Sequence, residues 1–210
     1  MNIKSFKMKC KCYKCKHKDL IVEISFDSTL AAVNQGAKQL FPPILPFIEY
    51  GDVIIIKGYI YSNGTWEKEP GCLDGNSMCG AQAGGGPTFN PIGQIVCTGT
   101  FFANPFSFFP QNQLPILGEE IGLFSLNLRF GTDTKNALEL RGRTITGFDG
   151  SNPALFSVLG GTGIFKYAKG QALEIMIRPN NSGAFNFVID LDGLRGVDKY
   201  QVKRLIRGCF

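Results

Sequence analysis

Strict alternation of apolar and polar residues is the feature that most limits what this chain can fold into. Positions 124–130 read FSLNLRF, with an apolar side chain at every even position, and the turn sequence GTD follows at 131–133. A period of two places one face of a strand in a core and leaves the other face polar. We therefore expect a half-buried β-strand here.

Six further strand-sized segments lie between turn signals. They are 20–26, 53–61, 94–102, 137–146, 170–177 and 184–191. The 26 Gly and 11 Pro residues, and the scarcity of periodic helical runs, are typical of short strands joined by tight turns. Seven or eight strands at this spacing predict an all-β fold. Closure into an eight-stranded antiparallel barrel would remove the exposed edges, and a barrel of this size can hold one small ligand.

The length and the charge distribution suggest one domain with two basic ends. The chain has 210 residues, 44% of them hydrophobic, which is enough for one substantial core. We expect a Lys- and Cys-rich arm at 1–18, a barrel domain at 19–195 and a basic tail at 196–210. The net charge of +5 is concentrated in the two ends. Charge runs are usually solvated, so two solvated arms are expected rather than a nucleic-acid or lipid contact.

Neither a membrane span nor a secretion signal is visible in the sequence. No apolar run approaches the roughly 18 residues that cross a bilayer. The basic start is followed by Cys and Lys rather than by an apolar signal core. We therefore predict a cytoplasmic protein.

The seven cysteines are unevenly placed. Three of them form the pattern C-x-C-x2-C-x-H with the single histidine: Cys10, Cys12, Cys15 and His17. Thiolates and imidazole could bind zinc or copper. However, four ligands within eight residues of a Lys-rich arm lack a framework, so a reduced tail is preferred over metal binding or disulfide chemistry. Cys72 and Cys79 would close a short loop only in an oxidising compartment.

A Phe-rich segment interrupts the strand pattern. Positions 101–110 read FFANPFSFFP, in which two prolines limit any regular strand while five Phe side chains need burial. The composition predicts a flap or an interface.

The second half of the chain resembles a known superfamily. The strand LELRGR at 138–143 is followed by FSVLGGTGIFKYAKG at 156–170. The two segments resemble the C-terminal signature of dirigent proteins, G-R followed by V-V-G-G-T-G-x-F-R-x-A-x-G. The same stretch is similar to the G-G-S-G-I-F-x-x-x-x-G-Q of allene oxide cyclases. The match covers mainly residues 120–178, and the insertion at 66–91 has no counterpart.

The glycine cluster within that motif has two physical interpretations. It can make a rim turn where one strand ends and the next begins, with Phe165 plugging the core. A phosphate-binding loop is the rival, but the cluster leads into a β pattern and is not followed by Lys-Ser or a helix start. We expect the rim turn.

The resemblance implies a homotrimer of eight-stranded barrels, each with a mostly apolar pocket and without metal or organic cofactor. Dirigent proteins steer radical or quinone-methide coupling. The cyclases, which are isomerases, hold a fatty-acid epoxide while its ring closes. Both work chiefly by confining a reactive ligand. Two alternatives stay open: a non-catalytic carrier of a hydrophobic molecule, and a structural or interaction protein with a filled barrel.

One acidic residue is the predicted catalyst. Glu23 falls where the first strand of dirigent proteins has its acid, and an acid walled in by apolar side chains has a raised pKa. We hypothesise that Glu23 points into the barrel and assists a cyclisation, although the alternation fits an exposed side chain equally well. The cyclase glutamate would fall on Phe26, and a cyclase tyrosine on Leu155. Neither family's set of catalytic residues is therefore complete in this chain.

Four further residues form the predicted ligand-binding set. Arg143 matches the Arg of the G-R element and could pair with a ligand carboxylate. Asp27 and Tyr59 are polar groups on predicted strands. Cys97 is the last member, and it also fits a small core residue.

Overall fold

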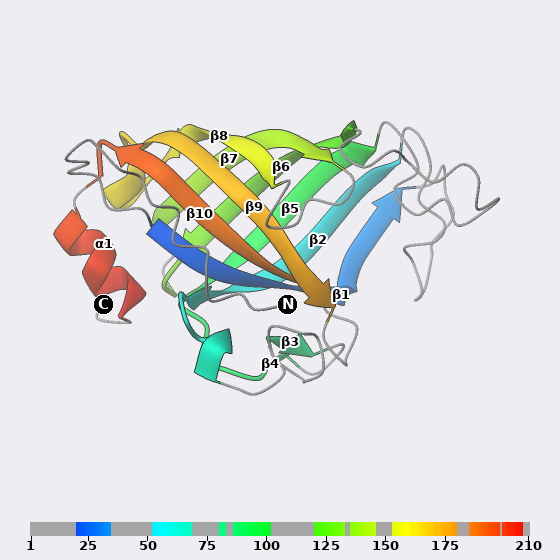
Figure 1. Ribbon diagram of the computed structural model, residues 1–210, viewed down its shortest axis with the longest axis horizontal. Coiled ribbons are helices and arrows are strands. Elements are labelled where there is room, and N and C mark those ends of the chain that lie inside the picture. The colour runs from blue at the N-terminus through cyan, green and yellow to red at the C-terminus, as the bar shows by residue number, and fades with distance from the viewer. Residues whose placement is uncertain are drawn as a thin grey trace.

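The computed structural model describes residues 20–34, 52–68, 80–82, 86–101, 120–132, 135–145, 153–179, 185–197 and 199–207. Eight strands close into an antiparallel barrel in the order β1-β10-β9-β8-β7-β6-β5-β2 (Figure 1). They are β1 (Leu20–Asn34), β2 (Val53–Ser62), β5 (Gly93–Phe101), β6 (Glu120–Phe130), β7 (Asn136–Ile145), β8 (Ala154–Gly161), β9 (Lys169–Pro179) and β10 (Phe185–Arg195). The predicted all-β barrel is confirmed.

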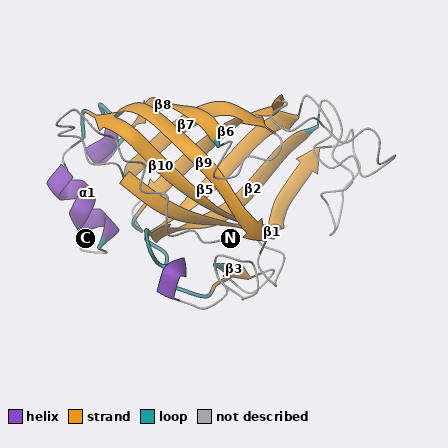
Figure 2. Cartoon of the chain, in the orientation of Figure 1, coloured by secondary structure: helices purple, strands orange, loops and turns teal. Residues whose placement is uncertain are grey.

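The remaining described elements are short. The strands β3 (Ala81–Gln82) and β4 (Gly86–Pro87) form a separate two-stranded sheet. Helical structure is confined to η3 (Trp66–Lys68), η5 (Gly163–Phe165) and α1 (Lys199–Ile206) in the described residues (Figure 2). Helix is the minority element, as the composition predicted.

The observed strands differ from the predicted segments at two places. The strand β8 was not among the predicted strands, although the family motif at 156–170 overlaps it. The strand β1 continues well beyond position 26, with a shift in its pairing to β2 between Phe26 and Ala31. Such a shift breaks the alternation of period two, so the sequence pattern ends where the regular pairing ends.

The barrel interior is apolar. Apolar side chains at alternate positions of the eight strands form one continuous buried cluster. Its members include Val22, Ile24, Ile56, Ile60, Ile95, Leu126, Leu128, Leu138, Leu140, Ile189 and Leu191. Because neighbouring positions along each strand face the other way, this cluster identifies which residues point inward.

Three interior Phe rings lie against glycines on the neighbouring strand. The cross-strand partners are Phe26 with Gly58, Phe124 with Gly99, and Phe156 with Gly142. A Cβ atom added at any of these glycines would collide with its partner's ring or the adjacent backbone. The missing side chains therefore leave the space along the barrel wall that the rings occupy.

One end of the barrel is closed by α1. Val202 and Leu205 of the helix join the barrel core, and the Ser62 hydroxyl donates a hydrogen bond to the Ile206 carbonyl at 2.8 Å. At the same end Phe165 is fully buried, with its ring centroid 5.1 Å from that of Phe130. A solvated tail was expected for this segment. Instead its apolar side chains pack on the barrel while its cationic side chains stay exposed.

The glycine motif forms the turn between β8 and η5. The Thr162 hydroxyl donates to the Lys135 carbonyl at 2.7 Å and accepts from the Ala137 amide at 3.2 Å. Gly163 has a φ of 58°, which favours glycine, and a Cβ at Gly161 would collide with the Ala137 carbonyl. The motif thus fastens the β8 end to the start of β7, as a rim turn requires.

Several predictions fall on residues outside the described ranges. They concern the Cys10, Cys12, Cys15 and His17 cluster, the Cys72 and Cys79 pair, and the Phe-rich segment beyond position 101. Within the described ranges, no three His, Cys, Asp or Glu side chains gather as a metal ion would require. In the same part of the chain, no helix has the length and apolar character to cross a membrane.

Candidate functional site

The carboxyl group of Glu174 points into the middle of the apolar barrel. Glu174 lies in the middle of β9, directly opposite Ala154 of β8 and Ile189 of β10. Both neighbours belong to the barrel core. Because directly opposed residues share a face of the sheet, Glu174 also points inward. Only 4% of its surface is exposed.

Burial changes the acid–base behaviour of this carboxyl. It raises the pKa of Glu174 from an ordinary 4.5 to about 8. The apolar surroundings disfavour the charged form, so the group is neutral at pH 7 and carries an O–H donor. A neutral carboxylic acid in a barrel can donate a proton to a bound molecule.

The thiol of Cys97 lies on the opposite side of the barrel. It is in the middle of β5, which is four strands away from β9 in either direction around the closed order. Burial, with a smaller contribution from the charge of Glu174, raises the pKa of the Cys97 thiol well above its ordinary value. The thiol is therefore neutral and is a poor nucleophile. Of the four predicted ligand-binding residues, Cys97 is the one whose neighbours place it on the inner face.

Aromatic rings line the barrel on the strand halves farther from α1. Phe26 and Phe187 meet edge to face with centroids 5.4 Å apart, and Phe101 and Phe124 do so at 5.1 Å. All four rings belong to the barrel core that surrounds the two titratable groups. Edge-to-face pairs hold ring positions in a packed interior.

The structure corrects the predicted orientation of Glu23. Its cross-strand partners are Val188 and Tyr61, which belong to a second cluster outside the barrel. Glu23 accepts hydrogen bonds from the backbone N–H groups of Gly64 at 2.7 Å and Trp66 at 2.9 Å. Burial raises its pKa, while these hydrogen bonds act in the opposite direction. The expectation that Glu23 points into the barrel is therefore wrong.

The insertion explains why Glu23 is buried although it faces outward. The segment that contains η3 and β3 lies against the outside of the barrel (Figure 1). The Ser25 hydroxyl accepts a hydrogen bond from the Ala81 amide at 2.8 Å. Trp66 is fully buried in the outer cluster with Tyr61. The outward face of β1 thus holds the insertion in place.

The other predicted site residues do not meet in the barrel. Arg143 is exposed and is paired with the half-exposed Leu155 across β7 and β8. Tyr59 packs against the outer cluster. Asp27 is buried next to Phe26, at the point where the pairing of β1 with β2 shifts. Phe26, where the cyclase glutamate would fall, does point inward, but it cannot carry acid chemistry.

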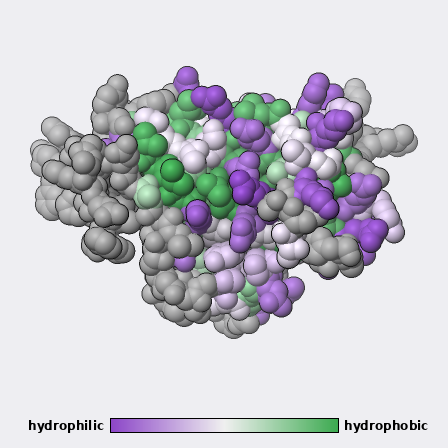
Figure 3. Space-filling view, turned by 180° about the vertical axis from the view of Figure 1, so that it is seen from behind, coloured by the Kyte–Doolittle hydropathy of each residue, from purple (hydrophilic) through white to green (hydrophobic). Residues whose placement is uncertain are grey.

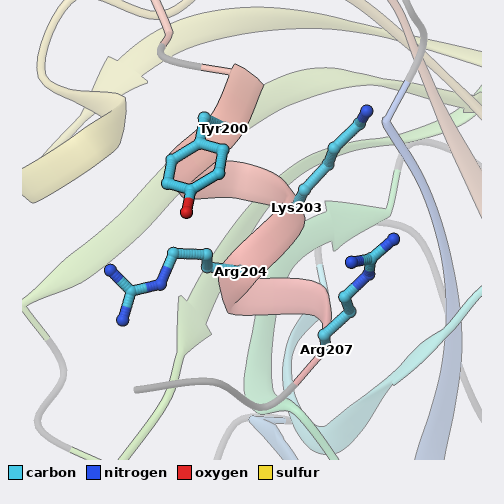
Figure 4. Close-up of a pocket in the computed structure, with 4 residues that line it drawn as sticks. All are labelled: Tyr200, Lys203, Arg204 and Arg207. Carbon is cyan, nitrogen blue, oxygen red and sulfur yellow. The ribbon is translucent and has the colours of Figure 1, made fainter.

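A separate hollow of about 420 Å³ lies beside α1 (Figure 4). Tyr200, Lys203, Arg204 and Arg207 line it. The four positions share the outward face of the helix, and their side chains spread apart in the close-up. This hollow is distinct from the barrel interior, because α1 itself separates the two.

Comparisons with known proteins bear on the fold. No protein-family description matches the sequence, and no curated protein sequence matches it. The pterocarpan synthase dirigent protein PsPTS1 is similar in structure, with a TM-score of 0.52 and 12% identity over 83% of this chain and 94% of that one. The chain has the dirigent barrel fold.

Two other solved structures are more distant. The dirigent protein GePTS1, also a pterocarpan synthase, has a TM-score of 0.49 and 13% identity, with 83% of each chain covered. The Diels Alderase AbmU from Streptomyces koyangensis has a TM-score of 0.40 and 11% identity, with 93% of this chain and 81% of that one covered. At such identities the likeness to the dirigent barrel concerns the fold alone.

Sequence reasoning missed Glu174. The strand reads ALEIMI at 172–177, so apolar residues occupy both faces and the alternation does not show where the acid points. The available signal was an isolated acid within an otherwise apolar strand. Pairing with Ala154 and Ile189 resolves the ambiguity.

Proposed function

We propose that this dirigent-fold barrel binds a small, mostly apolar organic molecule, on which the neutral carboxyl of Glu174 acts as general acid in a stereoselective ring closure or coupling. The supporting observation is one acid that has a pKa of about 8 and faces into an apolar interior. An acid with a pKa near the working pH is suited to proton transfer.

The proposed step is an isomerisation that needs no cofactor. Glu174 donates its proton to an oxygen of the ligand as the electron pair of a carbon–oxygen bond moves onto that oxygen. An electron-rich group of the same molecule then bonds to the carbon left electron-poor. The Glu174 carboxylate takes back a proton from the cyclised product, so that no atom is gained or lost.

Confinement would supply the stereoselectivity. The ring pairs of Phe26 with Phe187 and of Phe101 with Phe124 are packed against the barrel wall. A ligand held between rigid apolar walls reaches fewer conformations, and orientation of the reacting groups lowers the barrier. The stereochemical outcome would then follow from the shape of the interior.

Binding inside the barrel is tested with two neighbouring substitutions. Ala154→Phe adds a ring on the inner face beside Glu174, whereas Leu155→Phe changes an exposed side chain on the outer face. A neutral fluorescent probe, phenylnaphthylamine, should bind the unmodified protein and Leu155→Phe equally well. Ala154→Phe should lower the affinity for the probe by roughly tenfold or more. Cys97→Leu provides a second inward change if Ala154→Phe does not fold. Unchanged affinity in a folded inward variant would rule out a site in the barrel.

Catalysis is tested by separating turnover from binding. Neutral precursors able to cyclise would be incubated with the protein, and the products separated by chiral chromatography. Glu174→Gln should keep precursor binding but lose about a hundredfold or more in the rate of ring closure. Equal rates in both proteins, or a racemic product, would count against the enzyme proposal.

A non-catalytic carrier is the second candidate. Its supporting observation is that the residues directly opposite Glu174 on both neighbouring strands, Ala154 and Ile189, are apolar and supply no base. A carrier would bind the same molecules and release them unchanged. The chiral product assay distinguishes the two functions.

The resemblance to dirigent proteins also supports a homotrimer, which is a further part of the proposal. The large exposed hydrophobic side chains include Val53 and Ile55 on β2 and Leu155 and Leu159 on β8. Figure 3 shows hydrophobic patches among hydrophilic side chains on one face. Sedimentation at three times the 23.0 kDa of one chain is expected. Sedimentation as a monomer at micromolar concentration would contradict it.

A further inference from the structure

The end of the barrel that α1 closes carries a group of exposed cations. Three of them lie on α1, and three lie between η5 and β9 or at the end of β10, at the same end of the barrel (Figure 1). We call the surface that they form the basic end. The described residues of 161–170, 195–197 and 199–207 include no acidic side chain. The six exposed cations are Lys166, Lys169, Arg195, Lys203, Arg204 and Arg207.

The segments of the basic end are in direct contact. A Cβ atom added at Gly196 would collide with the carbonyl of Tyr167, so the residues that lead into α1 lie on the turn that follows η5. Lys169 and Arg195 are directly opposite each other in the pairing of β9 with β10. The cations therefore belong to one surface rather than to separate arms.

Local stability does not account for this cluster. Cations in the last turn of a helix interact favourably with the helix dipole, which explains Lys203 and Arg204 in part. Like charges directly opposite each other on paired strands, as Lys169 and Arg195 are, destabilise a sheet. A positive surface that is kept at a cost in stability favours an anionic partner.

Two tyrosine rings are exposed on the same surface. Tyr200 is 70% exposed and Tyr167 is 67% exposed. Tyr200 lines the hollow beside α1 together with the three cations of the helix (Figure 4). The Lys166 ammonium lies 5.1 Å from the centre of the Tyr167 ring. Exposed aromatic rings among cations are the combination that binds the bases and phosphates of single-stranded nucleic acids.

Other anionic partners fit this surface less well. The cationic side chains around the hollow spread apart rather than converging on one point, which suits a chain of phosphates better than one small anion (Figure 4). A helix that binds a lipid surface inserts its apolar face, whereas Val202 and Leu205 of α1 are buried in the barrel core. A duplex keeps its bases stacked on one another, so no base is available to stack on Tyr200.

We propose that the basic end binds single-stranded nucleic acid, with phosphates paired to Lys203, Arg204 and the neighbouring cations and with a base stacked on Tyr200. The basic tail was expected to be solvated, because charge runs usually are. Folding of this segment into α1 instead fixes its cations beside those of the strand ends. The proposal does not depend on the ligand of the barrel, because α1 separates the two sites.

The phosphate contacts are tested by fluorescence anisotropy of a labelled single-stranded oligothymidylate of about 15 nucleotides. Lys203→Gln with Arg204→Gln should lower its affinity roughly tenfold or more. The same change should flatten the slope of log affinity against log salt by about 1.4, since each phosphate contact to a single strand contributes about 0.7.

The matched control removes the same charge from the barrel wall. Lys57→Gln with Arg141→Gln neutralises two exposed cations of β2 and β7, and the oligonucleotide should bind this variant within a few-fold of the unmodified protein. Equal losses in the two double variants would overturn the proposal, because binding would then follow net charge alone. Failure of the unmodified protein to bind the oligonucleotide would also overturn it.

The stacking contact is tested at Tyr200. Tyr200→Ala should weaken oligothymidylate binding by roughly fivefold or more, whereas Tyr200→Phe keeps the ring and should have little effect. At physiological salt, the duplex of the same strand with oligoadenylate should bind more weakly than the single strand. Full affinity in Tyr200→Ala, or a duplex bound as tightly as the single strand, would contradict the proposal.

Lipid binding and folding are checked with the same proteins. Vesicles of phosphatidylcholine and phosphatidylserine should not displace the oligonucleotide, and displacement would identify the basic end as a lipid-binding surface instead. Phenylnaphthylamine should bind all of these variants and the unmodified protein equally, so that failure of this proposal is distinguishable from failure of the proposed function. Melting curves confirm that each variant is folded.

Discussion

Glu174 and Cys97 lie on opposite strands of the closed barrel, and burial, with a smaller contribution from the Glu174 carboxyl, raises the pKa of the Cys97 thiol. Neither group has a cationic neighbour on the described inner face. The pair therefore gives the middle of the barrel two neutral, weakly polar groups among apolar side chains. The proposed proton donor thus lies inside the barrel, whereas Glu23 faces the outer cluster.

Glu174 should make stability depend on pH. The folded carboxyl, with its pKa of about 8, stays protonated where the unfolded one, with an ordinary pKa of 4.5, is ionised. Unfolding therefore releases a proton between these values, and raising the pH favours the unfolded state. The stabilising contribution is complete below pH 4.5 and is lost as the pH rises through 8.

The measurement compares urea unfolding of the protein and Glu174→Gln from pH 5 to pH 8. The free energy of unfolding of the unmodified protein should fall relative to the variant by up to about 1.4 kcal/mol per pH unit. Parallel pH profiles would show that Glu174 is ionised in the folded state.

Cys97 should resist alkylation in the folded protein. Its thiol is buried and its raised pKa leaves little reactive thiolate. Treatment with iodoacetamide at pH 8, followed by peptide mass spectrometry, should leave Cys97 unmodified without urea and modified with it. Rapid labelling of Cys97 in the folded state would mean that the interior is open to the reagent.

Glu23 should hold the insertion rather than serve a ligand. Glu23→Ala removes both hydrogen-bond acceptors and leaves buried N–H groups unpaired, which costs about 1–3 kcal/mol of stability. Trp66, the single tryptophan, is fully buried, so its fluorescence should shift to the red in Glu23→Ala and not in Glu174→Gln. If the Trp66 spectrum were unchanged in Glu23→Ala while probe binding was lost, Glu23 would belong to the ligand-binding site.

The strand pattern predicted the barrel because most strands alternate cleanly between an apolar inner face and a mixed outer face. The segment 124–130 was sufficient to predict the fold, and the glycine motif at 160–163 was sufficient to predict the rim turn. At Glu23 the alternation described the two faces correctly, but the insertion buries the outer face as well. Burial and inward orientation are therefore different properties on β1.

The site itself could not be derived from local pattern. On β9 both faces are apolar, so the direction of Glu174 depends on its register with β8 and β10, which is a long-range property. Likewise, α1 follows from the packing of Val202 and Leu205 on a barrel end that is distant in sequence. The charge run at 199–207 gave no sign of that packing.

The Phe–Gly pairs make a stability prediction. Gly99→Val would place side-chain atoms where the Phe124 ring lies, and forcing that ring inward should cost about 1–3 kcal/mol or more. The control is Thr98→Val, at the neighbouring exposed position of the same strand, which should change stability by about 0.5 kcal/mol or less. Denaturant melts of both variants measure the difference. Equal stabilities would mean that Phe124 has room to move away from the wall.

The most direct test of Glu174 as a neutral proton donor is its titration in the folded protein. Glutamate labelled with carbon-13 at the side-chain carboxyl would be followed by NMR over pH, and Glu174→Gln would assign the resonance. We expect a midpoint near pH 8 for this one carboxyl. A midpoint close to the ordinary value of 4.5 would show a charged group in the barrel and would contradict the proposal that Glu174 is the proton donor.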